Sequence, residues 1–309
     1  MHGIEKGRPG RAGDAVIVTG SGTGLGLETA LHLAAQGFRV FATVRNGDQA
    51  PEVQAAADQR GLSLDVLQLD ITDPASIERA IAGALEQAGS IYGLVNNAGV
   101  GLRGSTEDCS AEEIRHLFDT NVLGTIAVTK AVIPSMRAAG CGRIITVSSV
   151  GGRICGFGVT MYCASKFAQE GLGEGLAQEL APFGIQSVIV EPGIIKTTRW
   201  SVNRGTAARA SDPESPYHDL FGAGEALAQK RVESSPTRPE DVAKAIAEAL
   251  TAEQPRMRYV VGRGAKVAIA LRRYMPQSLF ERLYFAGGIR RIEQRASEGQ
   301  SPPGAEPVR

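Results

Sequence analysis

The sequence has few residues of the kinds that mark metal-binding or disulfide-linked proteins. Four of its 309 residues are cysteine, namely Cys109, Cys141, Cys155 and Cys163, and no two of them form a C-x-x-C pair. This spacing gives no support to a zinc site or to a thioredoxin-like redox site, so we predict no metal. A large chain with so little cysteine is typical of a reducing compartment, and we expect a cytoplasmic protein.

The chain also lacks an excess of charge and a long apolar run. Lys and Arg total 33 and Asp and Glu total 33, so the formal net charge is zero and no nucleic-acid partner is expected. No run approaches the ~20 apolar residues that span a bilayer. Residues 1–14 carry charge, Gly and Pro, and we expect no signal peptide there. Apolar residues make up 43% of the chain, enough to form a core.

Short apolar runs alternate with segments of helical periodicity along most of the chain. Expected strands are 15–18, 39–44, 64–69, 91–95, 143–148, 185–190 and 259–261, and expected helices are 24–36, 74–87, 111–139, 162–180 and 239–250. This alternation predicts an α/β fold, a Rossmann-type doubly wound parallel sheet of about seven strands in a single domain with a C-terminal helical extension.

The predicted domain is framed by segments of different composition. Residues 1–13 are expected to be a flexible lead and residues 14–262 the Rossmann-fold domain. Residues 201–236 interrupt the alternation with Ser, Pro, Gly and mixed charge, which predicts a lid at about 199–236. The extension covers 263–296, and the polar segment 297–309 is expected to be a disordered tail.

A glycine-rich turn joins the first strand to the first helix. Its sequence, Thr19-Gly20-Ser21-Gly22-Thr23-Gly24-Leu25-Gly26, has the spacing T-G-x-x-x-G-x-G. Glycines let the backbone approach a pyrophosphate without Cβ clashes, and the helix N-terminus offers free N–H groups to its charge. The position between a buried strand and an amphipathic helix favours a dinucleotide site over a plain surface turn, with Gly20, Gly24, Leu25 and Gly26 as binding residues.

The end of the second strand indicates which dinucleotide binds. NAD sites usually place an acidic residue there to hold the ribose 2′-hydroxyl, whereas this chain has Val44 followed by Arg45. A guanidinium can pair with a 2′-phosphate, so we predict that NADP(H) is preferred, with NAD(H) as the alternative. Arg45 could otherwise be an ordinary surface cation.

Tyr162 and Lys166 are spaced for proton transfer. Positions i and i+4 of a helix share a face, so the phenol and the ammonium can point into one site. A free tyrosine, with a pKa near ~10, is a poor base, and an adjacent cation lowers that value. Ser149 stands at the end of the preceding strand, 13 residues before Tyr162, and its neighbour Ser148 is the alternative hydroxyl.

Three further segments complete the pattern: Asn96-Asn97-Ala98-Gly99, Asn121-Val122-Leu123-Gly124 and Pro192-Gly193-Ile194-Ile195-Lys196-Thr197. Together with the residues above, they resemble the classical short-chain dehydrogenase/reductase family over about residues 13–261. The resemblance implies an enzyme that transfers hydride between a nicotinamide cofactor and a carbonyl or alcohol. It implies catalytic roles for Asn121, Ser149, Tyr162 and Lys166, with Asn121 holding a water beside the lysine. The cofactor contacts that it implies are Asp70 at the adenine, Asn97, Ala98, Gly99, Tyr162, Lys166, Pro192, Gly193 and Thr197.

The C-terminal extension and the stretch 42–46 look most like the hydroxysteroid and retinol dehydrogenase branch, which implies a bulky lipophilic substrate. Substrate-specific residues are expected after Thr197, including Arg199, Trp200, Tyr217, His218 and Phe221. Residues 256–295 contain ten Lys or Arg against two Glu, together with apolar runs. We expect the extension, 263–295, to pack on the lid; contact with a membrane surface is the alternative.

Two further implications concern assembly and rival functions. Gly171, Gly173 and Gly175 lie in the helix of Tyr162, where close helix packing would offset their cost of about 1 kcal/mol each. Family members often associate through this helix, which implies a homodimer or homotetramer. The rival functions are a cofactor-binding sensor without turnover and, less well supported by the glycine spacing, a sugar epimerase of the extended family.

Overall fold

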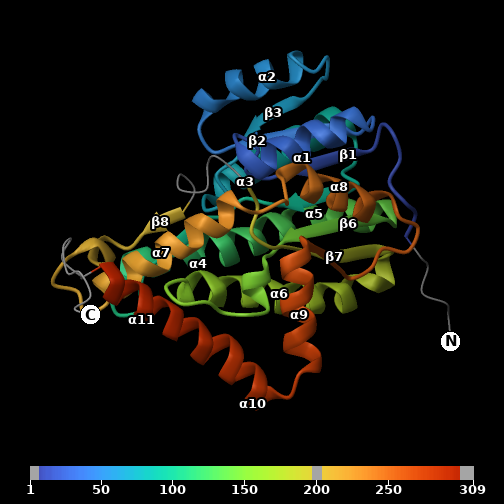
Figure 1. Cartoon of the computed structure of the whole chain (residues 1–309). Helices are drawn as coiled ribbons and strands as arrows, with labels where there is room; N and C mark the ends of the chain where they lie inside the picture. Colours follow the sequence, from blue (N-terminus) through green and yellow to red (C-terminus); the bar gives the residue numbers. More distant parts are fainter. Residues whose placement is uncertain (1–6, 197–203, 300–309) are drawn as a thin grey trace, which may run out of the picture.

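The computed structural model describes residues 7–196 and 204–299, and a seven-stranded sheet forms its centre (Figure 1). The strands are β1 (Ala15–Val18), β2 (Arg39–Val44), β3 (Asp65–Gln68), β4 (Gly93–Asn96), β6 (Gly142–Val147), β7 (Ile185–Pro192) and β9 (Arg258–Val261). Their order is β3-β2-β1-β4-β6-β7-β9, and every adjacent pair is parallel. This confirms the predicted fold class. The order reverses between β1 and β4, where open α/β sheets bind ligands at their carboxyl edge.

Helices cover both faces of the sheet. One face carries α1 (Gly24–Ala35) and α8 (Pro239–Thr251); the other carries α3 (Pro74–Ala88), α5 (Thr125–Ala139) and α6 (Thr160–Leu180). Val16 and Val18 belong to the core under α1 and α8, whereas Ile17 belongs to the core on the opposite face. A strand buried on both sides needs an uninterrupted apolar run, which explains the sequence of residues 15–18.

The expected helix at 111–139 forms as one continuous helix with a π-helical turn in its middle. It consists of α4 (Ala111–Phe118), the π-helical turn η2 (Asp119–Gly124) and α5. By length and hydropathy alone this helix could cross a membrane, although its apolar residues do not form one uninterrupted run. Val128, Val132 and Met136 are fully buried beside the sheet, as in a core helix of a globular domain.

The expected flexible lead is wrong for residues 7–13. The Gly10 amide donates a hydrogen bond to the Leu250 carbonyl at 2.9 Å, and the Tyr92 hydroxyl donates to the Arg8 carbonyl at 3.1 Å. Arg8 also pairs with Asp14 at 2.6 Å. These contacts fasten the segment to the domain; residues 1–6 lie outside the described part of the chain.

The expected irregular lid contains regular structure. Within its described part, β8 (Arg204–Thr206) pairs with β5 (Gly101–Arg103), the short turn η5 covers Ala208–Ser211, and α7 (His218–Glu233) is a 16-residue helix. The sequence hides α7 because two glycines and several charges interrupt its apolar spacing. The helix α2 (Ala50–Asp58), between β2 and β3, is a further element that the periodicity did not predict.

The C-terminal extension forms a helical arm, residues 263–299. Its elements are α9 (Arg263–Tyr274), α10 (Gln277–Phe280), the π-helical turn η6 (Glu281–Ala286) and α11 (Gly287–Gly299). Figure 1 shows α9 running away from the sheet, α10 at the tip, and α11 returning to α7. Helix α11 reaches Gly299, three residues beyond the expected end of the extension at 296, and residues 300–309 lie outside the described chain.

A fully buried arginine ties β6 to the end of α8. The Arg143 guanidinium donates hydrogen bonds to the carbonyls of Leu250 at 3.2 Å and Ala252 at 2.8 Å, and also to that of Ala249. The last carbonyls of a helix have no partners within the helix and carry its negative dipole end. Arg143 therefore supplies both the hydrogen bonds and the positive charge that the end of α8 requires.

Candidate active site

The glycine-rich turn packs too closely for side chains. A Cβ on Gly26 would lie 2.1 Å from the Gly20 carbonyl oxygen, and one on Gly20 would lie 2.9 Å from Ala98 Cα. Gly20 also has φ +70°, which favours glycine. At the start of α1, Thr23 makes no side-chain hydrogen bond to the helix, so its first N–H groups are left to a ligand. The turn thus fits a pyrophosphate.

The loop after β4 is fastened to this turn. Thr19 Oγ1 accepts hydrogen bonds from the amides of Asn97 at 3.0 Å and Ala98 at 2.9 Å, and Asn97 Nδ2 donates to the Thr19 carbonyl at 2.9 Å. A Cβ on Gly99 would lie 3.0 Å from Asn121 Oδ1. The predicted residues Asn97, Ala98 and Gly99 therefore join the glycine turn to the helix of Asn121.

Arg45 and Asp70 lie at the carboxyl ends of β2 and β3. Arg45 is exposed, and its backbone carbonyl accepts a hydrogen bond from the Gln68 side chain at 3.3 Å. Partial burial would raise the pKa of Asp70, but hydrogen bonds from Thr72 and the nearby charge of Arg45 hold it below the usual range. An ionised carboxylate and an unburied guanidinium thus flank the edge of the sheet where the adenosine half of a dinucleotide would lie.

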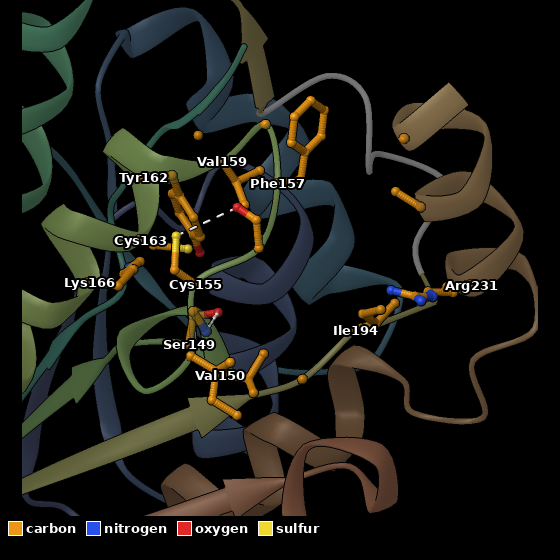
Figure 2. A pocket seen from close by; sticks show the side chains of 18 of the residues that line it. Ser149, Val150, Cys155, Phe157, Val159, Tyr162, Cys163, Lys166, Ile194 and Arg231 are labelled. Atoms are coloured by element: carbon orange, nitrogen blue, oxygen red, sulfur yellow. Dashed lines mark hydrogen bonds between the residues drawn. The ribbon is translucent and has the colours of Figure 1, made fainter. Parts of the chain in front are cut away.

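Three of the four predicted catalytic residues, Ser149, Tyr162 and Lys166, line a pocket of about 780 Å³ beyond the ends of β6 and β7 (Figure 2), whereas Asn121 is not among its lining residues. Ser149 Oγ accepts the Gly151 amide at 3.0 Å, which leaves its own proton to be donated. A Cβ on Gly151 would lie 3.4 Å from both Ser149 Oγ and Tyr162 Cε1, so these two side chains are close neighbours. The Ser148 hydroxyl lies against Glu170 instead, which favours Ser149 as the substrate-facing serine.

Eight of the predicted site residues line this pocket: Leu25, Asn97, Gly99, Ser149, Tyr162, Lys166, Pro192 and Gly193. The other predicted site residues that the structure describes lie around the pocket, in the turns that support it or at the edge of the sheet where the adenosine half of a dinucleotide would lie. Thr197 lies outside the described residues.

Lys166 is buried beneath Tyr162. Its ammonium lies 5.7 Å from the centre of the Tyr162 ring and donates hydrogen bonds to the Val147 carbonyl at 3.0 Å and to Gln169 Oε1 at 2.9 Å. Burial lowers the pKa of Lys166 to about 8, and the nearby carboxylate of Glu170 opposes this shift. The lysine therefore carries most of its charge at neutral pH and loses it just above.

Gln169 joins the lysine to Asn121. Its Nε2 donates to the Asn121 backbone carbonyl at 2.6 Å, while its Oε1 accepts from Lys166. The Asn121 side chain is used elsewhere: it accepts the Val100 amide at 2.8 Å and donates to the Val100 carbonyl at 2.9 Å. The resemblance implied a water between Asn121 and the lysine, whereas a side-chain amide spans that gap. The i+3 spacing of Gln169 from Lys166 was the signal that the sequence offered.

Beyond the catalytic residues the pocket is mostly apolar. Phe157, Val159 and Ile194 line it from the core domain, as Figure 2 shows. Its outer wall comes from α7, including Phe221 and Leu227, and from the arm. The arm residues in this wall are Leu283, Tyr284, Phe285, Gly288, Ile289, Arg291 and Ile292. The expected packing of the extension on the lid did not predict that these arm residues line the pocket.

Of the five substrate residues predicted after Thr197, Phe221 lines this pocket. Tyr217 and His218 are not among its lining residues, because they lie at the start of α7, one turn away. Arg199 and Trp200 lie outside the described residues.

Two cysteines line the same pocket as Tyr162. Cys155 and Cys163 both line the pocket, and their thiols are within hydrogen-bonding reach of each other. A hydrogen bond with the Cys163 thiol lowers the pKa of Cys155 to about 7. Thr160 adds to this shift, and burial opposes it. A lowered pKa makes a thiol more reactive, which marks this pair as the most reactive of the described cysteines.

This arrangement has counterparts among known proteins. A family model described as short chain dehydrogenase matches residues 14–207. The chain is 38% identical over 269 residues to an uncharacterized oxidoreductase, YusZ, of Bacillus subtilis, covering 86% of this chain and 95% of that protein. It is 35% identical over 253 residues to human 17-beta-hydroxysteroid dehydrogenase type 1, covering 79% of this chain and 76% of the relative.

A solved structure is also similar to this chain. An actinorhodin polyketide ketoreductase, crystallised with NADPH, superposes with a TM-score of 0.70 at 28% identity, over 82% of this chain and 97% of that one. Together with the family model and the hydroxysteroid relative, this similarity confirms the resemblance seen in the motifs. The chain belongs to the short-chain dehydrogenase/reductase family, oxidoreductases that act on alcohol and ketone groups with a nicotinamide cofactor.

Proposed function

We propose that this protein interconverts a bulky, lipophilic ketone or aldehyde and its alcohol with NADP(H). The observation that carries the proposal is the pocket itself. A polar end with Ser149, Tyr162 and Lys166 opens into an apolar chamber walled by α7 and the arm. Apolar walls with few polar groups suit a steroid-, retinoid- or polyketide-like molecule. The hydroxysteroid and polyketide relatives support this substrate class.

The residues divide the chemistry between them. A bound nicotinamide cofactor supplies or accepts the hydride. Ser149 donates a hydrogen bond to the substrate oxygen, where negative charge develops during reduction. Tyr162 gives that oxygen a proton, and the Lys166 ammonium stabilises the phenolate that remains. Gln169 keeps Lys166 in place by accepting one of its hydrogen bonds. Oxidation of an alcohol follows the same path in reverse.

The preference for NADP(H) rests on Arg45. It is exposed at the end of β2, where a carboxylate would repel a 2′-phosphate and a guanidinium attracts it. The test is fluorescence titration of the purified protein with NADPH and with NADH, repeated for Arg45→Asp. We expect the wild type to bind NADPH more tightly than NADH, and Arg45→Asp to remove this preference. Equal affinity for both cofactors, unchanged in the variant, would contradict the assignment.

Turnover separates an enzyme from a cofactor sensor on the same fold. We expect NADPH oxidation in a screen of lipophilic ketones, and loss of that activity in Tyr162→Phe with unchanged NADPH binding. A protein that binds NADPH and reduces no ketone or aldehyde would favour the sensor.

A homo-oligomer in the cytoplasm completes the proposal. Gly171 and Gly175 have no neighbouring atoms within 4 Å of an added Cβ, and Phe167, on the same helix, is 47% exposed. Another copy of α6 could cover this surface. Light scattering should give a dimer or tetramer for the wild type and a smaller species for Phe167→Glu.

A further inference from the structure

The outer surface of the helical arm gathers exposed apolar side chains. Seven of the eleven exposed large apolar side chains in the described residues belong to it: Val267, Leu271, Tyr274, Leu279, Leu283, Tyr284 and Phe285. Val267, Leu271 and Tyr274 follow one another at i, i+4 and i+7 and form one stripe along α9, with Tyr274 77% exposed. The opposite side of α9 faces the domain, where a Cβ on Gly193 would lie 2.9 Å from Ala265 Cβ.

The arm that carries this surface is strongly basic. Between 263 and 295 the arm carries Arg263, Lys266, Arg272, Arg273, Arg282, Arg290, Arg291 and Arg295 against two glutamates. All eight cations are exposed, and none pairs with a carboxylate within the ranges that the structure describes. A helix with exposed apolar residues and unpaired cations has the composition of one that lies in the headgroup region of a membrane.

The tip of the arm is held in this form by aromatic packing. Phe280 is buried, stacks on Tyr284 with ring centres 5.0 Å apart and meets Phe285 edge-on at 5.8 Å. The Arg272 guanidinium covers Phe280 at 5.2 Å. This cluster fixes α10 and η6 against α9. The exposed residues around it therefore belong to a folded surface.

The exposed surface is continuous with the substrate pocket. Leu283, Tyr284 and Phe285 line the pocket and are also between 40% and 56% exposed. α11 packs on α7, as expected of the extension, and its Ile289 and Ile292 also line the pocket. The arm thus has one side that closes the pocket and another that remains uncovered.

We propose that the arm docks this protein onto an anionic lipid bilayer, with α9, α10 and η6 in the headgroup region. Charge decides between a bilayer and a second copy of the chain. A two-fold contact through this surface would place its cations against themselves, which is unfavourable, whereas an anionic bilayer complements them. Because the pocket mouth lies in the same surface, a lipophilic substrate dissolved in the bilayer could enter directly. That last step rests on the proposed function; docking does not.

The test is co-sedimentation of the full-length protein with phosphatidylcholine vesicles, with and without phosphatidylserine, in the absence of cofactor and substrate. Binding that requires phosphatidylserine is expected. Each cation near an anionic surface contributes about fivefold to binding, so neutralising Arg272, Arg273 and Arg282 with Gln should weaken it about a hundredfold. Val267→Asp with Tyr274→Asp should also release the protein. Two controls lie outside the arm and should leave vesicle binding unchanged. One neutralises the exposed Arg79 and Arg115, and the other replaces an exposed apolar residue, Phe183→Asp.

Circular dichroism and NADPH titration of each variant show that the fold is retained. Failure of the wild type to sediment with anionic vesicles would overturn the proposal, as would equal binding of the arm variants and the controls. If Val267→Asp with Tyr274→Asp instead lowers the oligomeric state and the wild type ignores vesicles, the surface is an interface between copies. Ketone reduction in vesicle-free buffer is assayed separately, so a failure of docking and a failure of the proposed function can be distinguished.

Discussion

The amide of Gln169 should control the charge of Lys166. Replacing Gln169 with Leu keeps most of the side-chain volume and removes the acceptor that lies 2.9 Å from the buried ammonium. A hydrogen bond to a charged group contributes roughly 1.5–3 kcal/mol, and one pKa unit corresponds to about 1.4 kcal/mol. The pKa of Lys166, which burial already lowers to about 8, should therefore fall by about one to two units in Gln169→Leu.

The sign of the effect on activity follows from the direction of this shift. The ammonium stabilises the phenolate of Tyr162 only while it is protonated, so activity is lost as the pH rises through the pKa of Lys166. In Gln169→Leu the alkaline limb of the kcat profile for ketone reduction should move to lower pH by about one to two units. Gln169→Glu places a carboxylate beside the ammonium, raises its pKa and should move that limb to higher pH.

The pair of variants separates an electrostatic role from a structural one. Loss of packing alone would lower kcat at every pH and leave the limb in place, with the same sign for both substitutions. The assay is the pH dependence of kcat with the lipophilic ketone that the wild type reduces best, with NADPH saturating. If the alkaline limb of the kcat profile stays in place, or moves in the same direction in both variants, Gln169 does not control the charge of Lys166.

Three further substitutions test other parts of the structure. Gly26→Ala forces a Cβ to within 2.1 Å of a carbonyl oxygen. Strain of about 1–3 kcal/mol should weaken NADPH binding about five- to a hundredfold. The control Gly47→Ala, whose added Cβ lies in open space, should bind NADPH normally in the same titration. Arg258→Leu leaves the buried carboxylates of Glu170 and Glu191 with Arg153 as their remaining cation among the described residues, and loss of a hydrogen bond to a charged group should cost roughly 1.5–3 kcal/mol of unfolding free energy in urea. Arg115→Leu, at an exposed ion pair, should change it by less than about 1 kcal/mol. N-ethylmaleimide should inactivate the enzyme with a pH midpoint near the Cys155 pKa of about 7, and resistance should follow Cys155→Ser; equal sensitivity of that variant would show that another thiol is responsible.

The sheet and the shared pocket of Ser149, Tyr162 and Lys166 were predictable because their signals are local. A strand buried on both faces has to be apolar throughout, as at 15–18, and a tyrosine four residues before a lysine on a helix has to share its face. Gln169 lay in the same turn, but glutamine at a buried position has no distinctive pattern, and its role became visible only with the Asn121 carbonyl beside it.

The walls of the pocket were harder to predict because they depend on distant packing. In α7, Phe221 is buried against Leu102 and Leu117, which lie more than a hundred residues earlier in the chain, and the helix also packs on α11, so no helical period shows in the sequence alone. The composition of 263–295 suggested two environments, the lid and a membrane, and we treated them as alternatives. The structure gives the arm two sides, so a lid contact and an uncovered surface coexist.

The buried guanidinium of Arg143 has a consequence for how the chain acquires its structure during synthesis. Its carbonyl partners lie more than a hundred residues later, at Ala249, Leu250 and Ala252. Until that segment has left the ribosome, the buried cation has the Gln186 side chain but none of these three carbonyls as an acceptor, which is a costly state. The nascent chain should therefore remain incompletely folded, and open to proteases or chaperones, until α8 emerges. Chains truncated before residue 250 should never reach the stable state.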